Sequence, residues 1–491
     1  MAEQQHRVYS LGTEPTRTGI GGLSVKASAV AIGAFLLAVV AMSMQQWKLT
    51  LLIAVLAVIF VGLVSMPWKG RSLGEGIQLW FQVAKRRVAG TDTYIAGPES
   101  ELPGGHFQQP GMSAATQLLS GVDAANREFG IILDVSGRKA TVCLKLNLSG
   151  DVPRTMAERY EATDRYGGWL ASLSLWSDID SAVTVVATRP ATGSLMKREV
   201  AHLESDDGSP IAREVAHQAA EMLGNNVPEI EAHAAITFRI SMKSPSDREF
   251  VNQIVYRLPT MYRGLSWAGI TAVPMTEQDI SARALSFACP DTEASLEHLA
   301  VTGQEHGMSW DNVGSGFAVD MGDHYFHDGC RSMSFEMING PAATFEEGVL
   351  RPLLAPHPRI ERKRVALVYR PYEASRGAKL VEKEWIDARN ELTSQRNRAR
   401  GSSELREEQT NEARRAFARG AQLGRHSLIV TVTAGHDADL AALEADVMEI
   451  SAQSNIRLAK MTGWQDAGFD ISRGLGQLPF NKETTASALR K

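Results

Sequence analysis

Cysteine is scarce in this chain: Cys143, Cys289 and Cys330 are the only three among 491 residues. They are widely spaced and odd in number, so we expect no disulfide framework and take a reducing compartment as the simpler assumption. The chain also lacks a large excess of one charge, because its formal net charge at pH 7 is −5. This argues against a strongly basic nucleic-acid-binding protein. A hydrophobic share of 44% and a charged share of 22% are globular values and do not indicate broad disorder.

Several catalytic motifs are absent as well. No Gly-Lys pair occurs, so the chain has no G-x-x-x-x-G-K-[ST] loop to hold phosphates, which argues against a P-loop NTPase. Neither G-x-G-x-x-G nor H-E-x-x-H is present. G-x-S-x-G occurs once, at residues 70–74. A nucleophile elbow requires a strand before the serine, and none is expected there, so we interpret the motif as a flexible connection rather than a hydrolase site.

Long uncharged runs, by contrast, are present near the start of the chain. Residues 27–44 and 49–67 carry no charge and are joined by the short link 45–48. Each run is close to the roughly 20 residues with which a helix crosses ~30 Å of hydrocarbon. We therefore expect a transmembrane helical hairpin; a signal peptide or a buried hairpin is the alternative. Lysine and arginine are more frequent on both flanks than in the link, which predicts a multi-pass protein of the cytoplasmic membrane with both termini cytoplasmic.

Residues 72–88 follow the hairpin and have the pattern of an amphipathic helix. The apolar side chains of Ile77, Trp80, Phe81, Ala84 and Val88 share one face, and three cations end the segment. We expect an interfacial helix that buries its aromatic rings near lipid headgroups. The alternative is an ordinary linker helix on the folded part of the chain.

Beyond residue 116 the pattern alternates between strands and helices, as in an α+β protein. A β-hairpin is expected around residues 136–138, and a second one around Asp328 and Gly329. Over 362–462 the order strand, helical hairpin, strand, helix, strand indicates a ferredoxin-like unit. No sequence repeat is strong enough to relate the first module to the last.

The predicted fold class is thus α+β, with an N-terminal transmembrane helical hairpin followed by cytoplasmic ferredoxin-like α/β modules. The predicted organisation is a flexible N-terminal arm (1–23), the transmembrane hairpin (24–68), an interfacial helix and linker (69–115), a first α/β module (116–265), an irregular middle region with a β-hairpin (266–358), a second ferredoxin-like module (359–480) and a flexible tail (481–491).

One group of polar residues near the second hairpin has side chains that can bind a transition metal. Its members are Asp320, Asp323, His324, His327, Asp328 and Cys330. In a strand, however, His324 and His327 would point to opposite faces, which opposes joint ligation. The alternative is the polar end of a hairpin with structural histidines.

A second candidate is the basic segment Arg362, Lys363 and Arg364, which follows a Pro-rich turn at 354–359. This segment is either a docking surface for an anionic partner or a solvated strand edge whose charges discourage aggregation.

Short motifs occur in order along nearly the whole chain, at residues 103–107, 169–173, 262–265, 310–311, 325–328, 353–358, 362–365, 369–371, 465–469 and 478–479. With these motifs the chain resembles a family of conjugation-associated membrane proteins from Gram-positive bacteria, chiefly actinobacteria. Members combine a PrgI-like two-helix hairpin with a region resembling the N-terminal, non-ATPase part of the conjugative type IV secretion ATPase.

The resemblance implies a non-catalytic membrane subunit of a type IV secretion or conjugative transfer machine, which couples a separate conjugative-type transport ATPase to polytopic channel subunits. It also implies a homo-oligomer, such as a hexameric ring, at the lipid bilayer, without sequence-specific nucleic-acid binding. The alternatives are a type VII secretion subunit with two membrane helices and a cytosolic domain, and a membrane-tethered enzyme that uses the His324/His327 region. We assign no catalytic, cofactor-binding or metal-binding residue and expect no cofactor.

Overall fold

The computed structural model describes residues 25–65, 67–68, 71–97, 100, 108–147, 154–203, 209–224, 228–242, 248–339, 345–394 and 401–478. They form two compact units, one up to residue 92 and one from residue 93 onward. The predicted flexible arm (1–23) and tail (481–491) lie outside the described residues.

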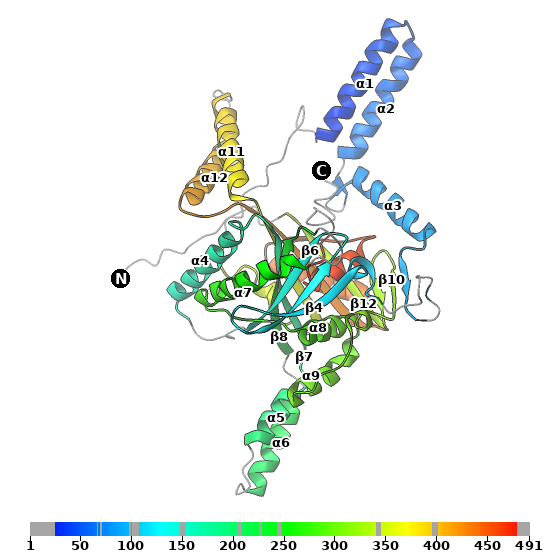
Figure 1. Ribbon diagram of the computed structural model, residues 1–491. Coiled ribbons are helices and arrows are strands. Elements are labelled where there is room, and N and C mark those ends of the chain that lie inside the picture. Colours follow the sequence, from blue (N-terminus) through cyan, green and yellow to red (C-terminus); the bar gives the residue numbers. More distant parts are fainter. Residues whose placement is uncertain are drawn as a thin grey trace. The chain divides into compact units, whose positions relative to one another are not determined.

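The first unit is helical. Helices α1 (Val25–Ser43) and α2 (Trp47–Ser65) form a hairpin (Figure 1), and Gln45 takes a left-handed φ of 54° in the turn. Two short strands, β1 (Pro67–Trp68) and β2 (Arg71–Ser72), then pair before α3 (Leu73–Val88). Helix α3 covers most of the segment 72–88, where an amphipathic helix is predicted. Its side chains Trp80, Phe81 and Val88 are exposed.

No helix among the described residues is both long and apolar enough to span a bilayer. A helix that crosses the hydrocarbon core of a bilayer needs about 20 consecutive apolar residues. This finding overturns the predicted transmembrane hairpin at 24–68, and with it the predicted two-pass location in the cytoplasmic membrane.

The second unit is built on a single 13-stranded sheet (Figure 1) in which all neighbouring strands are antiparallel. Its strands are β3 (Thr93–Ile95), β4 (Thr116–Val122), β5 (Glu128–Asp134), β6 (Lys139–Asn147), β7 (Ile179–Pro190), β8 (Pro228–Arg239), β9 (Thr271–Pro274), β10 (Phe317–Asp320), β11 (Tyr325–His327), β12 (Cys330–Asn339), β13 (Arg362–Pro371), β14 (Gly424–Gly435) and β15 (Arg457–Lys460). The order is β3-β10-β11-β12-β14-β13-β7-β8-β6-β5-β4, while β15 also pairs with β12 and β9 with β6.

The helices of this unit are α4 (Met156–Leu173), α5 (Ser194–Leu203), α6 (Pro210–Gly224), α7 (Glu249–Trp267), α8 (Glu277–Ala288), α9 (Glu293–Thr302), α10 (Arg351–Leu354), α11 (Ala374–Ser394), α12 (Gly401–Ala418), α13 (Leu440–Gln453) and α14 (Gln465–Ser472). Short 3-10 turns occur at η2 (Gly111–Ser113), η3 (Pro290–Thr292) and η4 (Trp310–Asn312).

The sheet consists of two topological repeats. One runs β6, α4, β7, the α5–α6 hairpin, β8, α7, β9; the other runs β12, α10, β13, the α11–α12 hairpin, β14, α13, β15. The strand orders match: β9-β6-β8-β7 in the first repeat and β15-β12-β14-β13 in the second. Each repeat is followed by a further helix, α8 or α14. The sequence alone did not reveal this relation.

The two repeats join where β7 pairs with β13, antiparallel, from Ala182 opposite Tyr369 to Thr188 opposite Lys363. We call this pairing the seam. β7 and β13 occupy equivalent places at the edges of their repeats. Each strand therefore provides hydrogen-bond partners for the edge of the other. The chain is therefore α+β, and the modules that the sequence predicted form one continuous sheet.

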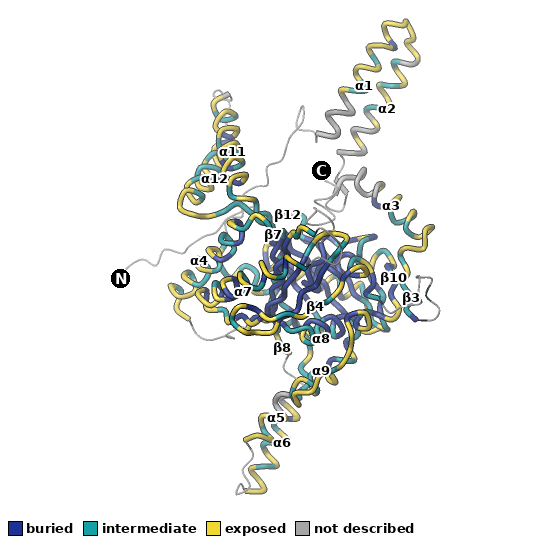
Figure 2. The backbone as a smooth tube through the Cα atoms, in the orientation of Figure 1, coloured by how far each residue is buried: buried dark blue, intermediate teal, exposed yellow. Residues whose placement is uncertain are grey.

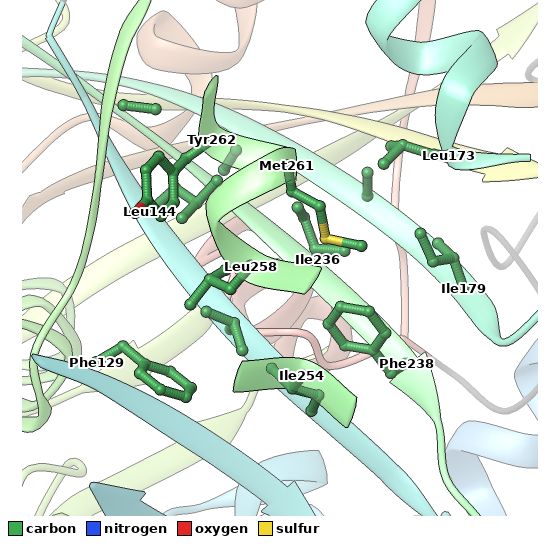
Figure 3. Close-up of a cluster of buried hydrophobic side chains, with 14 of the residues drawn as sticks. Phe129, Leu144, Leu173, Ile179, Ile236, Phe238, Ile254, Leu258, Met261 and Tyr262 are labelled. Carbon is green, nitrogen blue, oxygen red and sulfur yellow. The ribbon is translucent and has the colours of Figure 1, made fainter. Parts of the chain in front are cut away.

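Side chains alternate between the two faces of the sheet and create two layers of core. On one face, α4 and α7 cover residues such as Val142 and Ile236, and α10 and α13 cover Val365 and Val430. Figure 3 shows part of this layer, where Ile254, Leu258 and Met261 of α7 lie over Ile236 and Phe238 of β8. On the other face lie α8 and α14. Figure 2 shows the buried residues concentrated in the sheet and its covering helices.

Candidate functional site

The six residues proposed as metal ligands do not come together around one point. The Asp320 carboxylate accepts a hydrogen bond from the Gly322 N–H (2.8 Å), and Asp323 pairs with Nδ1 of His324 (2.8 Å). Asp328, at a φ of 42°, accepts from the N–H groups of Gly316 and Phe317, both at 3.0 Å. Among the described residues, no group of three or more His, Cys, Asp or Glu could hold a metal ion.

His327 is a fully buried structural residue. Its Nδ1 lies 2.7 Å from the Ala288 carbonyl oxygen, and its Nε2 lies 2.8 Å from Oγ of Ser332. Since a carbonyl can only accept, Nδ1 carries the proton and Nε2 accepts from the serine hydroxyl. Burial lowers the pKa of His327 to about 3, so the ring stays neutral and both of its nitrogens are used.

The surroundings of the three cysteines raise the pKa of their thiols. Burial raises the pKa of the Cys143 thiol to about 12, and burial is also the largest cause of the raised pKa of Cys289 and Cys330. A thiol acts as a nucleophile or metal ligand only as the thiolate, which these environments oppose.

The serine of the G-x-S-x-G motif, Ser72, ends β2 directly before α3. The expectation that no strand precedes it is therefore wrong, although this strand has only two residues and pairs only with β1.

The basic segment lies in the middle of the sheet, not at an edge, because β13 pairs with β14 on one side and β7 on the other. Lys363 and Arg364 are buried and point to opposite faces. Nζ of Lys363 donates to the Ala355 carbonyl oxygen at 2.6 Å, and burial lowers the pKa of this lysine to about 8. Neither a solvated edge nor an exposed docking surface describes this segment.

A network of ion pairs beside the seam is the largest cluster of charged groups in the described sheet, and sequence reasoning missed it. Arg189 of β7 pairs with Glu229 (2.6 Å) and Glu231 (3.0 Å) of β8 and approaches Glu293 (3.3 Å) of α9. Arg283 pairs with Glu231, and Arg362 of β13 pairs with Glu293. The network ties both repeats together through charges from β7, β8, β13, α8 and α9. Its groups are far apart in sequence, so no local signal marks it.

A second buried polar group surrounds α14. Asp470 binds Nη2 of Arg473 (2.7 Å) and the Met112 N–H (2.9 Å), while Arg473 also reaches Gln109 and Ser113. Burial raises the pKa of Asp470 to about 6. The group fastens the last described segment onto η2 and the sheet.

An open groove of about 640 Å³ lies beside the edge strand β4 and the start of α7. It is lined by Leu119, Ser120, Ile131, Arg248, Glu249, Val251 and Asn252. This set includes no histidine or cysteine to act as base or nucleophile beside Ser120, so the groove has no catalytic arrangement of the usual kind.

Helix α6 also exposes apolar side chains. Ile211, Val215 and Met222 are 76%, 58% and 70% exposed and recur at i, i+4 and i+11 along this helix. Residues at this spacing lie along one side of a helix. The α5–α6 hairpin extends away from the sheet (Figures 1 and 2), and the stripe is exposed. We call these three residues the α6 stripe.

Residues 16–75 match the model of a family described as a domain of unknown function (DUF8461). No curated protein matches the chain.

Proposed function

We propose that the chain is a non-catalytic structural subunit of a type IV secretion or conjugative transfer machine, and that it binds the transport ATPase of that machine. Two observations from the sequence support this proposal. The motifs resemble the conjugation-associated family, and no phosphate-binding loop is present in the sequence. A motor on a separate chain would supply the hydrolysis.

The α6 stripe is the observation that carries the proposal. An amphipathic helix that exposes an apolar stripe is suited to lie in a hydrophobic groove of another protein. Burying such side chains is favourable by about 1.5–3 kcal/mol each, so three of them supply the centre of a stable contact. The same hairpin occurs in the other repeat as α11–α12, where charges of both signs cover the helices.

This difference assigns the two hairpins different tasks in the proposal. The apolar α6 stripe binds the conjugative-type ATPase, while the charged α11–α12 hairpin stays in water. Copies of the chain assemble beside polytopic channel subunits, and the contacts are with protein rather than with a nucleic-acid sequence.

Affinity purification of the tagged full chain from cells that carry out conjugative transfer tests the proposal. We expect recovery of a P-loop ATPase of the conjugative class together with the wild-type chain. Double substitution Ile211→Glu and Val215→Glu should reduce this recovery at least tenfold, because two carboxylates would have to be buried in an apolar groove.

Ile386→Glu is the matched control, since Ile386 is an exposed isoleucine of α11 in the equivalent hairpin. It should leave recovery unchanged. Recovery of a type VII secretion ATPase instead, or equal loss with both variants, would contradict the proposal.

A further inference from the structure

Arg364 is a buried arginine at the seam. It lies in β13 on the face covered by α8 and α14, and is 5% exposed. Its guanidinium carbon lies 4.7 Å from the centre of the Phe287 ring and 4.5 Å from that of Phe469. The two rings provide favourable cation–π contacts, but they accept no conventional hydrogen bond from the guanidinium edge.

The polar edge of Arg364 is not satisfied by the described residues. Its Nε and Nη2 have no hydrogen-bond partner. Burial lowers the pKa of Arg364 to about 9, and the charges that affect it most are Arg473, then Asp470, then Arg362. Two of these three are positive. Leaving a buried charge and two N–H donors without an acceptor costs several kcal/mol, so a missing acceptor is expected beside this edge.

A cavity of about 20 Å³ adjoins Arg364. It is also lined by Arg189, Phe287 and Thr433. About 10–15 Å³ of such space holds one water molecule, so the cavity admits a single particle of that size. Nε and Nη1 of Arg189 add donors without a hydrogen-bond partner, although they lie 3.3 and 3.5 Å from the carboxylates of Glu293 and Glu297.

We propose that this cavity binds a single monatomic anion, for which chloride is the probe. An anion accepts hydrogen bonds from the N–H groups of Arg364 that lack a partner, and it also balances the positive charge of this side chain. A water molecule accepts the hydrogen bonds but does not balance the charge. The carboxylates that line the cavity, Glu231 and Glu293, do not do so, because Arg283 and Arg362 engage them. Sulfate is the comparison anion, because it is polyatomic and larger than a halide.

The proposed site connects elements of both repeats. Arg189 belongs to β7, Arg364 to β13 and Phe287 to α8, so a bound anion contacts both strands of the seam and the helix over it. The anion thus acts as a structural ligand that stabilises the joined sheet, independently of the proposed function.

Thermal unfolding of the purified full chain in chloride, bromide and sulfate at matched ionic strength tests the site. A ligand that binds only the folded state raises the melting temperature with its concentration. We expect an increase of about 1–3 °C per tenfold rise in chloride or bromide, and no such increase in sulfate. Arg364→Leu should abolish the halide dependence, whereas Arg376→Leu, in exposed α11, should retain it.

Equilibrium dialysis of the wild-type chain with radiolabelled chloride tests the site without any variant. We expect about one bound chloride per chain, displaced by bromide. Equal melting temperatures in all three salts, absence of bound chloride, or an unchanged halide effect in Arg364→Leu would each overturn the proposal in favour of a water-filled cavity.

Discussion

At the scale of single residues, two buried histidines form hydrogen bonds through their ring nitrogens to groups distant in sequence. His327 uses both ring nitrogens, and Nε2 of His233 lies 2.9 Å from the Arg473 carbonyl oxygen. Burial lowers the pKa of His233 to about 4, as it lowers that of His327 to about 3. Both rings stay neutral in the fold because imidazolium would lose its water there.

These histidines predict acid sensitivity. In the unfolded chain a histidine pKa is about 6.5, so below that pH the unfolded state binds more protons and stability falls as pH falls towards 4. Each histidine contributes about 1.4 kcal/mol per pH unit to the slope of the free energy of unfolding against pH. Asp470 has the opposite effect on stability. Its pKa is raised from 3.8 to about 6 in the fold, so between pH 6 and 3.8 the folded state binds more protons and stability rises as the pH falls.

The variant His327→Asn isolates one histidine. Asparagine preserves a donor for the Ala288 carbonyl but does not titrate. The slope of the free energy of unfolding against pH, measured between pH 6 and 4.5, should therefore decrease by about 1.4 kcal/mol per pH unit. Urea unfolding at a series of pH values measures it. His202→Asn, at an exposed position of α5, should retain the wild-type slope; an unchanged slope in His327→Asn would show that this histidine is not neutral in the fold.

Glycine near the end of the described chain permits close packing. Gly476 has a φ of +83°, and a Cβ added there would overlap the Thr141 side chain. Gly329 has a φ of +82° with nothing within 4 Å of an added Cβ. Gly329→Ala and Gly476→Ala should each lower the free energy of unfolding by about 1 kcal/mol through backbone strain. Gly476→Ala should lower it by about 1–3 kcal/mol more, because its Cβ also clashes with Thr141. Chemical denaturation of both variants measures the difference, and equal losses would contradict the packing at Thr141.

At the scale of elements, local sequence signals set where helices begin. Thr155 precedes α4 and forms a capping box: its hydroxyl accepts from the Glu158 N–H (3.3 Å), and the Glu158 carboxylate accepts from the Thr155 N–H (2.7 Å). The lowered pKa of Glu158 has this backbone hydrogen bond as its largest cause. Such pairs satisfy N–H groups that the first helical turn leaves free.

Thr155→Ala should therefore lower the free energy of unfolding by about 0.5–2 kcal/mol. Thr302→Ala is the control, because this threonine lies at the end of α9 and its hydroxyl only bonds back to its own helix. Its effect should remain within about 0.5 kcal/mol. Denaturant titration followed by circular dichroism compares the two, and equal effects would argue against the capping box.

At the scale of the second unit, the seam should make the two repeats unfold together. Val183 and Val185 of β7 share one buried cluster with Ala366 and Val368 of β13 and Ile471 of α14. The core on this face is therefore common to both repeats and cannot be lost from one alone.

Hydrogen exchange tests this coupling. Val185→Ala removes two buried methyl groups, and we expect a loss of about 1–3 kcal/mol of stability. Amide protection should decrease equally in β8 of the first repeat and β14 of the second. Val215→Ala, on the exposed α6 stripe, should change neither strand; a decrease confined to β8 would contradict a single cooperative sheet.

The sequence by itself determined many of the elements of the second unit and their order. The hairpin predicted around residues 136–138 is formed by β5 and β6, and the one around Asp328 and Gly329 is formed by β11 and β12. These signals are local, because alternation and helical spacing depend on neighbouring residues. The short strands β3 and β9 gave no such signal. Long apolar runs likewise predicted the helices α1 and α2, but the prediction that they span a membrane was wrong.

Only the tertiary structure decided how these elements combine. The pairing of β7 with β13 depends on two edges about 180 residues apart having matching hydrogen bonds and buried faces, and no local pattern encodes that match. For the same reason the sequence showed Arg364 only as part of a basic segment. Its burial between Phe287 and Phe469 follows from the packing of α8 and α14 on the seam, where distant residues meet because their apolar faces must be removed from water.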